Sequence, residues 1–127
     1  MNINKSVGND GEKTVIKYLK KHKYKIIDTN YSCKYGEIDI IAESRDYVAF
    51  IEVKTRAYGQ MLEPRSAVDK RKQQRIIKTA SIFLYTYESK KLPRFDIAEV
   101  IIDQKGKKTI NYFENAFWQE NNGYAGF

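Results

Sequence analysis

The sequence predicts a mixed α/β fold in which helices flank a central mixed sheet, with the element order α-β-β-β-α-β and an extra C-terminal edge strand. Two segments carry apolar residues at helical spacing, and β-rich runs lie between and after them. The composition, 42% hydrophobic and 13% aromatic, is that of a chain with a buried core. At 127 residues without an internal repeat or linker, the chain is expected to form one domain, 1–127.

The first half of the chain is expected to supply one helix and three strands. Val15, Ile16 and Leu19 recur at helical spacing and define the apolar face of the helix. The polar turn at 44–46 separates two β-rich runs, as is typical of an antiparallel hairpin. The expected elements are a helix over 6–22, a strand that begins at 24–27, and strands over 36–43 and 47–55.

The second half is expected to begin with a long helix and to end with two strands. The helix has an apolar stripe that must face a sheet, formed by Ile76, Ile77, Ala80, Phe83, Leu84 and Tyr87. Gly106 marks a turn between the last two strands. The expected elements are a helix over 66–87, a strand over 95–103, a turn over 104–107 and an edge strand over 109–113.

The charge of the chain leaves two interpretations open. Lys and Arg outnumber Asp and Glu by 23 to 16, which gives a net charge of +7 and a pI near 9.4. Such an excess is typical of a protein that binds a polyanion such as nucleic acid. A basic, solvated surface without a partner would give the same composition.

The inventory of reactive side chains excludes several classes of enzyme. Cys33 is the single cysteine, so an internal disulfide and a multi-cysteine zinc site are excluded. His22 is the single histidine, and its lysine-rich surroundings indicate a surface position at a helix end. Ser-His-Asp and two-histidine zinc chemistry therefore lack their residues. The polar residues 1–12 are unlike a secretory signal and no apolar run is long enough to span a membrane, so a cytoplasmic protein is expected.

Two acidic residues interrupt the first strand of the predicted hairpin. Because side chains alternate along a strand, Glu37 and Asp39 are expected on one face and Ile38 and Ile40 on the other. An acid in an apolar strand needs a partner or a metal ion.

The second strand of the hairpin carries a further acid and a lysine. Glu52 and Lys54 are expected on the face that Val48 and Phe50 share. One interpretation is structural: Glu52 and Lys54 form a pair on the same face, or Lys54 pairs across the strands with Asp39 or Glu37. The other is functional: an acidic pocket that holds a divalent cation beside a lysine.

Glu12 is open to two interpretations as well. It precedes Val15, Ile16 and Leu19 by three, four and seven residues, which directs it toward the core side of the first helix. If Asn9 is the N-cap, Glu12 closes a capping box. If the helix begins at Ser6, Glu12 is a third inward carboxylate.

The long helix has a similar ambiguity. Lys72 and Gln73 extend its inward stripe as polar side chains, and they either border a site or form the solvated end of the stripe.

The pattern of Asp39, Glu52 and Lys54, on adjoining strands after a helix that bears Glu12, resembles the PD-(D/E)xK nuclease signature in its E-x-K form. The element order resembles the restriction-endonuclease-like core of that superfamily. One departure is Ile38, which stands where the signature has proline.

Longer sequence motifs narrow the resemblance to one protein family. The motifs GEIDIIA over 36–42 and FIEVKTR over 50–56 resemble those of the YraN family of small uncharacterised bacterial proteins, and the resemblance covers nearly the whole chain. The order of a helix glutamate, a strand aspartate and E-x-K is also similar to that of archaeal Holliday-junction resolvases. Shorter motifs that also resemble this family are Gly8, Gly11-Glu12, Lys72-Gln73, Arg94-Phe95-Asp96 and Ala116-Phe117.

The resemblance implies a metal-dependent DNA endonuclease that hydrolyses phosphodiester bonds, with branched or damaged DNA among its substrates. The implied ligands of Mg²⁺ or Mn²⁺ are Asp39, Glu52, Glu12 and the backbone carbonyl of Val53. Lys54 would orient the attacking water, and Glu37 would be an outer acid or a partner for Lys54. The expected nucleic-acid contacts are Lys72, Gln73, Arg56 and Arg75.

Two other classes of function use the same fold. A non-catalytic nucleic-acid-binding module would keep the basic surface, and its acids would serve only as structural pairs. A protein-interaction module would use the same core without binding DNA. A homodimer is expected if the protein cuts two strands symmetrically.

Overall fold

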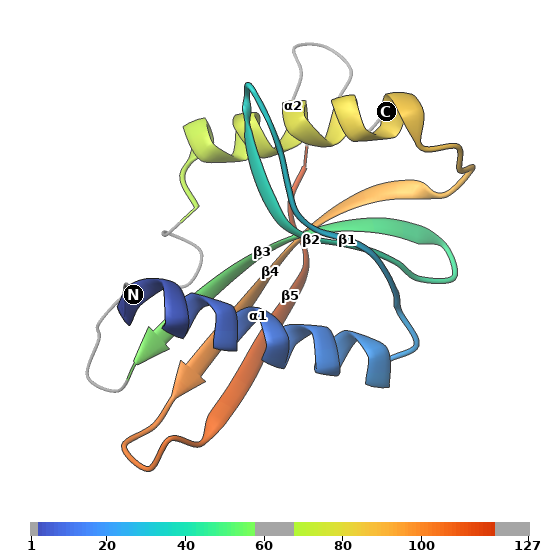
Figure 1. Ribbon diagram of the computed structural model, residues 1–127. Helices are drawn as coiled ribbons and strands as arrows, with labels where there is room; N and C mark the ends of the chain where they lie inside the picture. Colours follow the sequence, from blue (N-terminus) through green and yellow to red (C-terminus); the bar gives the residue numbers. More distant parts are fainter. Residues whose placement is uncertain (1–2, 58–67, 119–127) are drawn as a thin grey trace.

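The computed structural model describes residues 3–57 and 68–118, with side chains from Asp10 onward in the first helix. The order of helices and strands in this part of the chain confirms the predicted α/β fold, a restriction-endonuclease-like core followed by a C-terminal edge strand (Figure 1). The elements are α1 (Ile3–Lys21), β1 (Lys25–Cys33), β2 (Gly36–Glu43), β3 (Tyr47–Ala57), α2 (Lys70–Thr86), β4 (Leu92–Ile102) and β5 (Lys108–Phe117). Neither α1 nor α2 has the length and apolar content needed to cross a membrane.

The five strands form one mixed sheet in the order β1-β2-β3-β4-β5. Neighbouring strands are antiparallel except β3 and β4, which are parallel and joined through α2. The two helices cover opposite faces of the sheet (Figure 1). β3 is therefore buried on both sides, which explains its nearly continuous apolar run.

Each helix packs on its own hydrophobic cluster. On the α1 side, Val15 and Leu19 are fully buried against small and branched strand residues: Ile40, Ala42, Ala49, Ile51, Ala98 and Val100. On the α2 side, the ring of Phe50 stacks on Phe95 at 5.5 Å and meets Phe83 edge-on at 5.9 Å. Each buried Val, Leu, Ile or Phe side chain among these stabilises the fold by about 1.5–3 kcal/mol, so both helices are firmly docked on the sheet.

A glycine allows the first helix to approach the sheet closely. A Cβ atom at Gly11 would lie 2.1 Å from the Oγ1 atom of Thr55 on β3, closer than nonbonded atoms can approach. Any larger residue would therefore push α1 away from β3. The contact keeps α1, and with it the next residue Glu12, close to β3.

Both helix starts differ from the expected ones. α1 begins at Ile3, before Ser6, so Asn9 lies inside the helix and the capping-box interpretation of Glu12 is wrong. α2 begins at Lys70 rather than at Ser66, which lies outside the described residues. The carboxylate of Asp69 accepts a hydrogen bond from the backbone N–H of Lys72 at 2.8 Å and caps the helix there.

The last two strands are longer than expected. β4 already begins at Leu92, and Pro93 pairs with Val48 in the parallel ladder. The proline is tolerated because β5 pairs with β4 only from Phe95 onward and requires no N–H donor at Pro93. β5 extends to Phe117 and forms an edge of the sheet, as expected.

The faces of β2 do not alternate as strictly as expected. Ile38 packs in the α2-side cluster and Ile40 in the α1-side cluster, so the expectation that they share a face is wrong. The reason is that β2 pairs with β3 only from Ile40, opposite Ile51, to Glu43. The residues of β2 before Ile40, from Gly36 onward, pair with β1 alone and form a two-stranded arm. Figure 1 shows this arm rising from the sheet beside α2.

Candidate functional site

The site lies at the fork where β2 separates from β3. Ile40 and Ile51 form the pair nearest the fork. Next to this pair, the side chain of Asp39 replaces a backbone carbonyl as hydrogen-bond acceptor: its Oδ2 atom accepts a hydrogen bond from the backbone N–H of Val53 at 2.8 Å. This bond fixes Asp39 beside Glu52, the residue that precedes Val53 on β3. The E-x-K segment and the aspartate are thus brought together by strand geometry.

A cleft of about 530 Å³ opens at this fork, between the arm and the N-terminal half of α2. Its lining residues are Gly36, Glu37, Asp39, Glu52, Asp69, Arg71, Lys72, Arg75 and Ile76. Four of these are acidic and three are basic, so the cleft combines carboxylates with a cationic helix wall.

Glu52 is buried in this cleft, with a residue exposure of 7%. The Nζ atom of Lys72 lies 2.9 Å from its Oε2 atom, which forms an ion pair between β3 and α2. The same Oε2 atom is buried and receives no hydrogen bond of regular geometry. A buried carboxylate oxygen with spare coordination capacity is a feature of sites that bind a hard cation.

Asp39 and Glu52 titrate as a coupled pair. Burial, together with the hydrogen bond and the charge of Glu52, raises the pKa of Asp39 to about 9. Burial also raises the pKa of Glu52, but the hydrogen bond with Asp39 and the ammonium of Lys72 outweigh it and lower the pKa overall. At neutral pH the pair therefore holds one proton between two carboxylates.

Two lysines lie against this acidic pair. Burial, followed by contact with the ammonium of Lys72, lowers the pKa of Lys54. For Lys72, burial also lowers the pKa, but the contacts with Lys54 and Glu52 outweigh burial and raise the pKa overall. Lys54 is thus the more easily deprotonated amine, and Lys72 the one that keeps its charge.

Glu12 reaches the site from α1. It is partly buried, and its Oε1 atom accepts a hydrogen bond from the Nδ2 atom of Asn30 on β1 at 3.2 Å. Burial raises its pKa, and the charges of Glu37 and Glu52 add to this effect. Glu12 thus lies within the electrostatic reach of the cleft without lining it, and Glu37 lines the cleft from an exposed position.

The structure separates the four residues expected to contact nucleic acid. Lys72 and Arg75 line the cleft. Arg56 instead forms an ion pair with the buried carboxylate of Glu99 on β4. Gln73 donates from Nε2 to the backbone carbonyl of Val68 at 3.0 Å and lines a different groove, on the far side of α2.

Sequence reasoning missed three residues of the site, among them Asp69, the N-cap of α2, which lines the cleft. Arg71 lines the cleft one helical turn before Arg75, and this i, i+4 spacing could have revealed it. Asn30 holds Glu12 from a strand that no motif marks. Its backbone has a φ of 54°, a left-handed conformation that asparagine tolerates.

The donor set suits Mg²⁺ or Mn²⁺ bound with much of its water shell. Among the described residues, no three His, Cys, Asp or Glu side chains are arranged to hold a metal ion by themselves. Mg²⁺ commonly uses only one or two protein carboxylates and keeps several waters. Asp39 and Glu52, with the buried Oε2 atom of Glu52, fit this coordination, and Glu12 is placed to act from further out.

Comparison with known proteins identifies relatives over most of the chain. The model of the uncharacterised protein family UPF0102 matches residues 11–100. A UPF0102 protein of Alkaliphilus metalliredigens is 44% identical over 120 residues, which cover 91% of this chain and 100% of the relative. Similar proteins of Caldanaerobacter subterraneus subsp. tengcongensis and Clostridium acetobutylicum are 42% and 41% identical, and cover 89% and 91% of this chain and 95% and 96% of their own lengths.

Proposed function

Because the chain belongs to the uncharacterised protein family UPF0102, the YraN family, its function must be argued from its site, and we propose that it is a metal-dependent DNA endonuclease. One observation carries the proposal: the carboxyl groups of Asp39 and Glu52 lie together in an open cleft, beside Lys54 and Lys72. A structural role would be served better by pairing each acid with a base, because two adjacent carboxylates destabilise the fold.

The acids of the site would hold Mg²⁺ or Mn²⁺. When bound, the metal stabilises charge on a phosphate and lowers the pKa of a coordinated water. Asp39 and Glu52 would be its ligands, and Glu12 would act directly or through water. Asp39 must lose its proton before it can bind a cation, so the raised pKa of this residue makes binding pH-dependent.

The lysines of the site would act on the water and the phosphate. Lys54 would orient the attacking water and accept its proton, because its lowered pKa makes the neutral amine more accessible. Lys72 keeps its charge and would stabilise the negative charge of the scissile phosphate. The exposed guanidinium groups of Arg71 and Arg75 would contact neighbouring phosphates, a sequence-independent and salt-sensitive interaction.

A two-stage experiment tests this function. Calorimetric titration with Mg²⁺ and Mn²⁺ should show binding by the wild type and none by Asp39→Asn. Cleavage of linear, flapped and four-way DNA should then be lost in both Asp39→Asn and Lys54→Met. Glu88→Gln, which removes an exposed carboxylate from the segment after α2, is the matched control and should cut like the wild type.

Two results would contradict the proposal. Absence of carboxylate-dependent metal binding in the wild type would leave the acids without their role. Cleavage that survives in both Asp39→Asn and Lys54→Met would come from a contaminating nuclease. DNA binding without metal binding would instead favour a non-catalytic nucleic-acid-binding module.

A further inference from the structure

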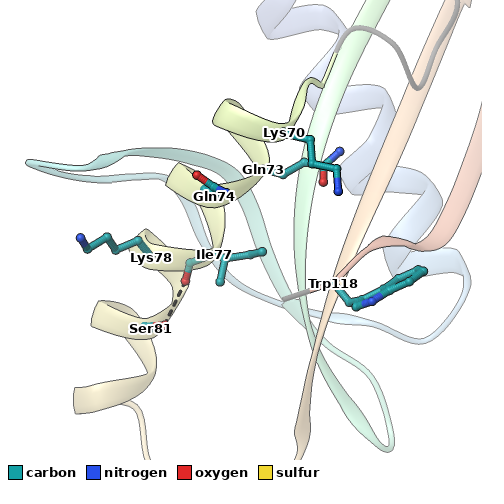
Figure 2. A pocket seen from close by; sticks show the side chains of 7 residues that line it. All are labelled: Lys70, Gln73, Gln74, Ile77, Lys78, Ser81 and Trp118. Atoms are coloured by element: carbon teal, nitrogen blue, oxygen red, sulfur yellow. Dashed lines mark hydrogen bonds between the residues drawn. The ribbon is translucent and has the colours of Figure 1, made fainter. Parts of the chain in front are cut away.

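A second groove lies on the other side of α2 from the cleft. It has a volume of about 380 Å³ and is lined by Lys70, Gln73, Gln74, Ile77, Lys78, Ser81 and Trp118. Trp118 follows the end of β5 and is 52% exposed. Figure 2 shows Trp118 on one wall of this groove and the side chain of Ile77 pointing toward it from α2. A large indole is thus presented to solvent beside a helix with polar and basic side chains.

The outer face of α2 connects this groove to the cleft. Successive helix residues are separated by 100°, so Lys72 and Ile76 face the cleft while Gln73 and Ile77 face the groove. A shallow hollow on the solvent side of α2 lies between them. It is lined by Cys33, Lys34, Tyr35, Gly36, Arg71, Gln74, Arg75 and Lys78. It shares Arg71 and Arg75 with the cleft, and Gln74 and Lys78 with the groove.

Charge changes along this path in a way that suits a phosphate chain. The hollow is lined by four cationic side chains and no acid, and the groove by two lysines and no acid. All four acids of these three surfaces lie in the cleft, where the metal is proposed to bind. A nucleic-acid backbone is therefore attracted along the outer face of α2 and is repelled in the cleft unless a cation is present.

We propose that this groove binds an unpaired base of the DNA substrate, which stacks on Trp118 while its backbone crosses the outer face of α2 into the cleft. The inference rests on the proposed nuclease function and specifies its substrate as DNA with a single-stranded segment. An indole stacks on the face of a base, and this face is free only where the base is not stacked in a duplex. A helix with its side chains is about 10–12 Å across, so a few nucleotides of unpaired backbone separate the stacked base from the cleft.

Trp118 is the single tryptophan of the chain, and its fluorescence reports on the groove directly. The experiment titrates the full-length protein in EDTA with the oligonucleotide dT12 or with a blunt 12-base-pair duplex, and it follows Trp118 emission together with the anisotropy of labelled DNA. We expect dT12 to quench the emission and the duplex not to quench it at equal saturation. Trp118→Ala should weaken dT12 binding about 5- to 150-fold and leave duplex binding unchanged.

Two further variants separate stacking from a general loss of structure. Trp118→Phe keeps an aromatic face and should retain most of the affinity for dT12. Tyr85→Ala removes an aromatic side chain that is 91% exposed on α2 outside the groove, and it should bind like the wild type. Asp39→Asn should bind dT12 and show quenching, because it lacks only the catalytic carboxylate. Quenching without any cleavage by the wild type would thus contradict the nuclease function alone.

Three results would overturn the inference. The first is binding of dT12 without quenching of Trp118. The second is equal affinity of the wild type and Trp118→Ala for dT12. The third is a dimer, seen by sedimentation, that dissociates in Trp118→Ala, because the groove would then be a surface for self-association.

Discussion

Replacing Asp39 with asparagine should stabilise the metal-free protein at neutral pH. The carboxyl group of Asp39 is buried beside Glu52, and the folded protein keeps it protonated well above its usual pKa. An asparagine has the same shape: its Oδ1 atom can accept the hydrogen bond of the Val53 N–H, and its amide can donate to Glu52. The variant therefore keeps the contacts of the site without having to take up a proton.

The size of the effect follows from the pKa of Asp39 in the two states. The pKa is 3.8 for an aspartate side chain in water, as in the unfolded chain, and about 9 in the folded protein, so the folded state binds the proton more tightly. The stability contributed by this proton is fully present below pH 3.8 and is lost as the pH rises through 9. At about 1.4 kcal/mol per pH unit, roughly 4 kcal/mol is lost at pH 7. Since Glu52 shares the proton, we expect a gain of about 2–4 kcal/mol, or about 6–15 °C in melting temperature.

Urea denaturation followed by circular dichroism, in EDTA at pH 4 and pH 7, measures this gain. The difference between Asp39→Asn and the wild type should be close to zero at pH 4 and largest at neutral pH and above. Glu88→Gln, an exposed carboxylate remote from the cleft, should show no such pH-dependent difference. A variant that is less stable than the wild type at pH 7, or a gain that is equal at both pH values, would refute the reasoning.

Three further predictions concern the same region. Metal affinity should rise with pH up to about 9 because Asp39 must release its proton before the metal binds. Calorimetry in buffers of different ionisation enthalpy should detect the released proton, and binding that does not depend on pH would contradict this. Gly11→Ala should destabilise the fold by about 1–3 kcal/mol in thermal melts, and a second change, Thr55→Ala, should restore part of the loss. With saturating metal, cleavage rates should fall as the pH falls below the lowered pKa of Lys54, because the protonated amine cannot accept a proton; a rate that does not change with pH would contradict this.

Much of the fold was predictable because burial imposes a period on the sequence. Val15 and Leu19 recur at helical spacing because one face of α1 packs on the sheet. The hairpin of β2 and β3 was predictable because a polar turn separates two runs rich in β-branched residues. The carboxylates Asp39 and Glu52 stood out since an acid in such a run needs a physical reason.

Other features depend on tertiary contacts that no local pattern encodes. The separation of β2 from β3 before Ile40 places Ile38 and Ile40 in different clusters, and a period of two cannot show where strands separate. The ion pair between Arg56 and Glu99 depends on the alignment of β3 with β4. The start of α2 is a different case, since Asp69 is a regular capping residue that the sequence does contain.

The arrangement of charge at the fork is the strongest argument that these residues serve a ligand. Folding alone would favour alternation of acids and bases, yet Asp39 lies against Glu52 and Lys54 lies against Lys72. Each like pair costs stability, because one acid must take up a proton and the pKa of one lysine must fall. A cation bound by the acids and a phosphate bound by the lysines would relieve both conflicts at once. The proposed substrate complex thus adds opposite charges beyond the ion pair of Glu52 with Lys72, as expected where function overrides local stability.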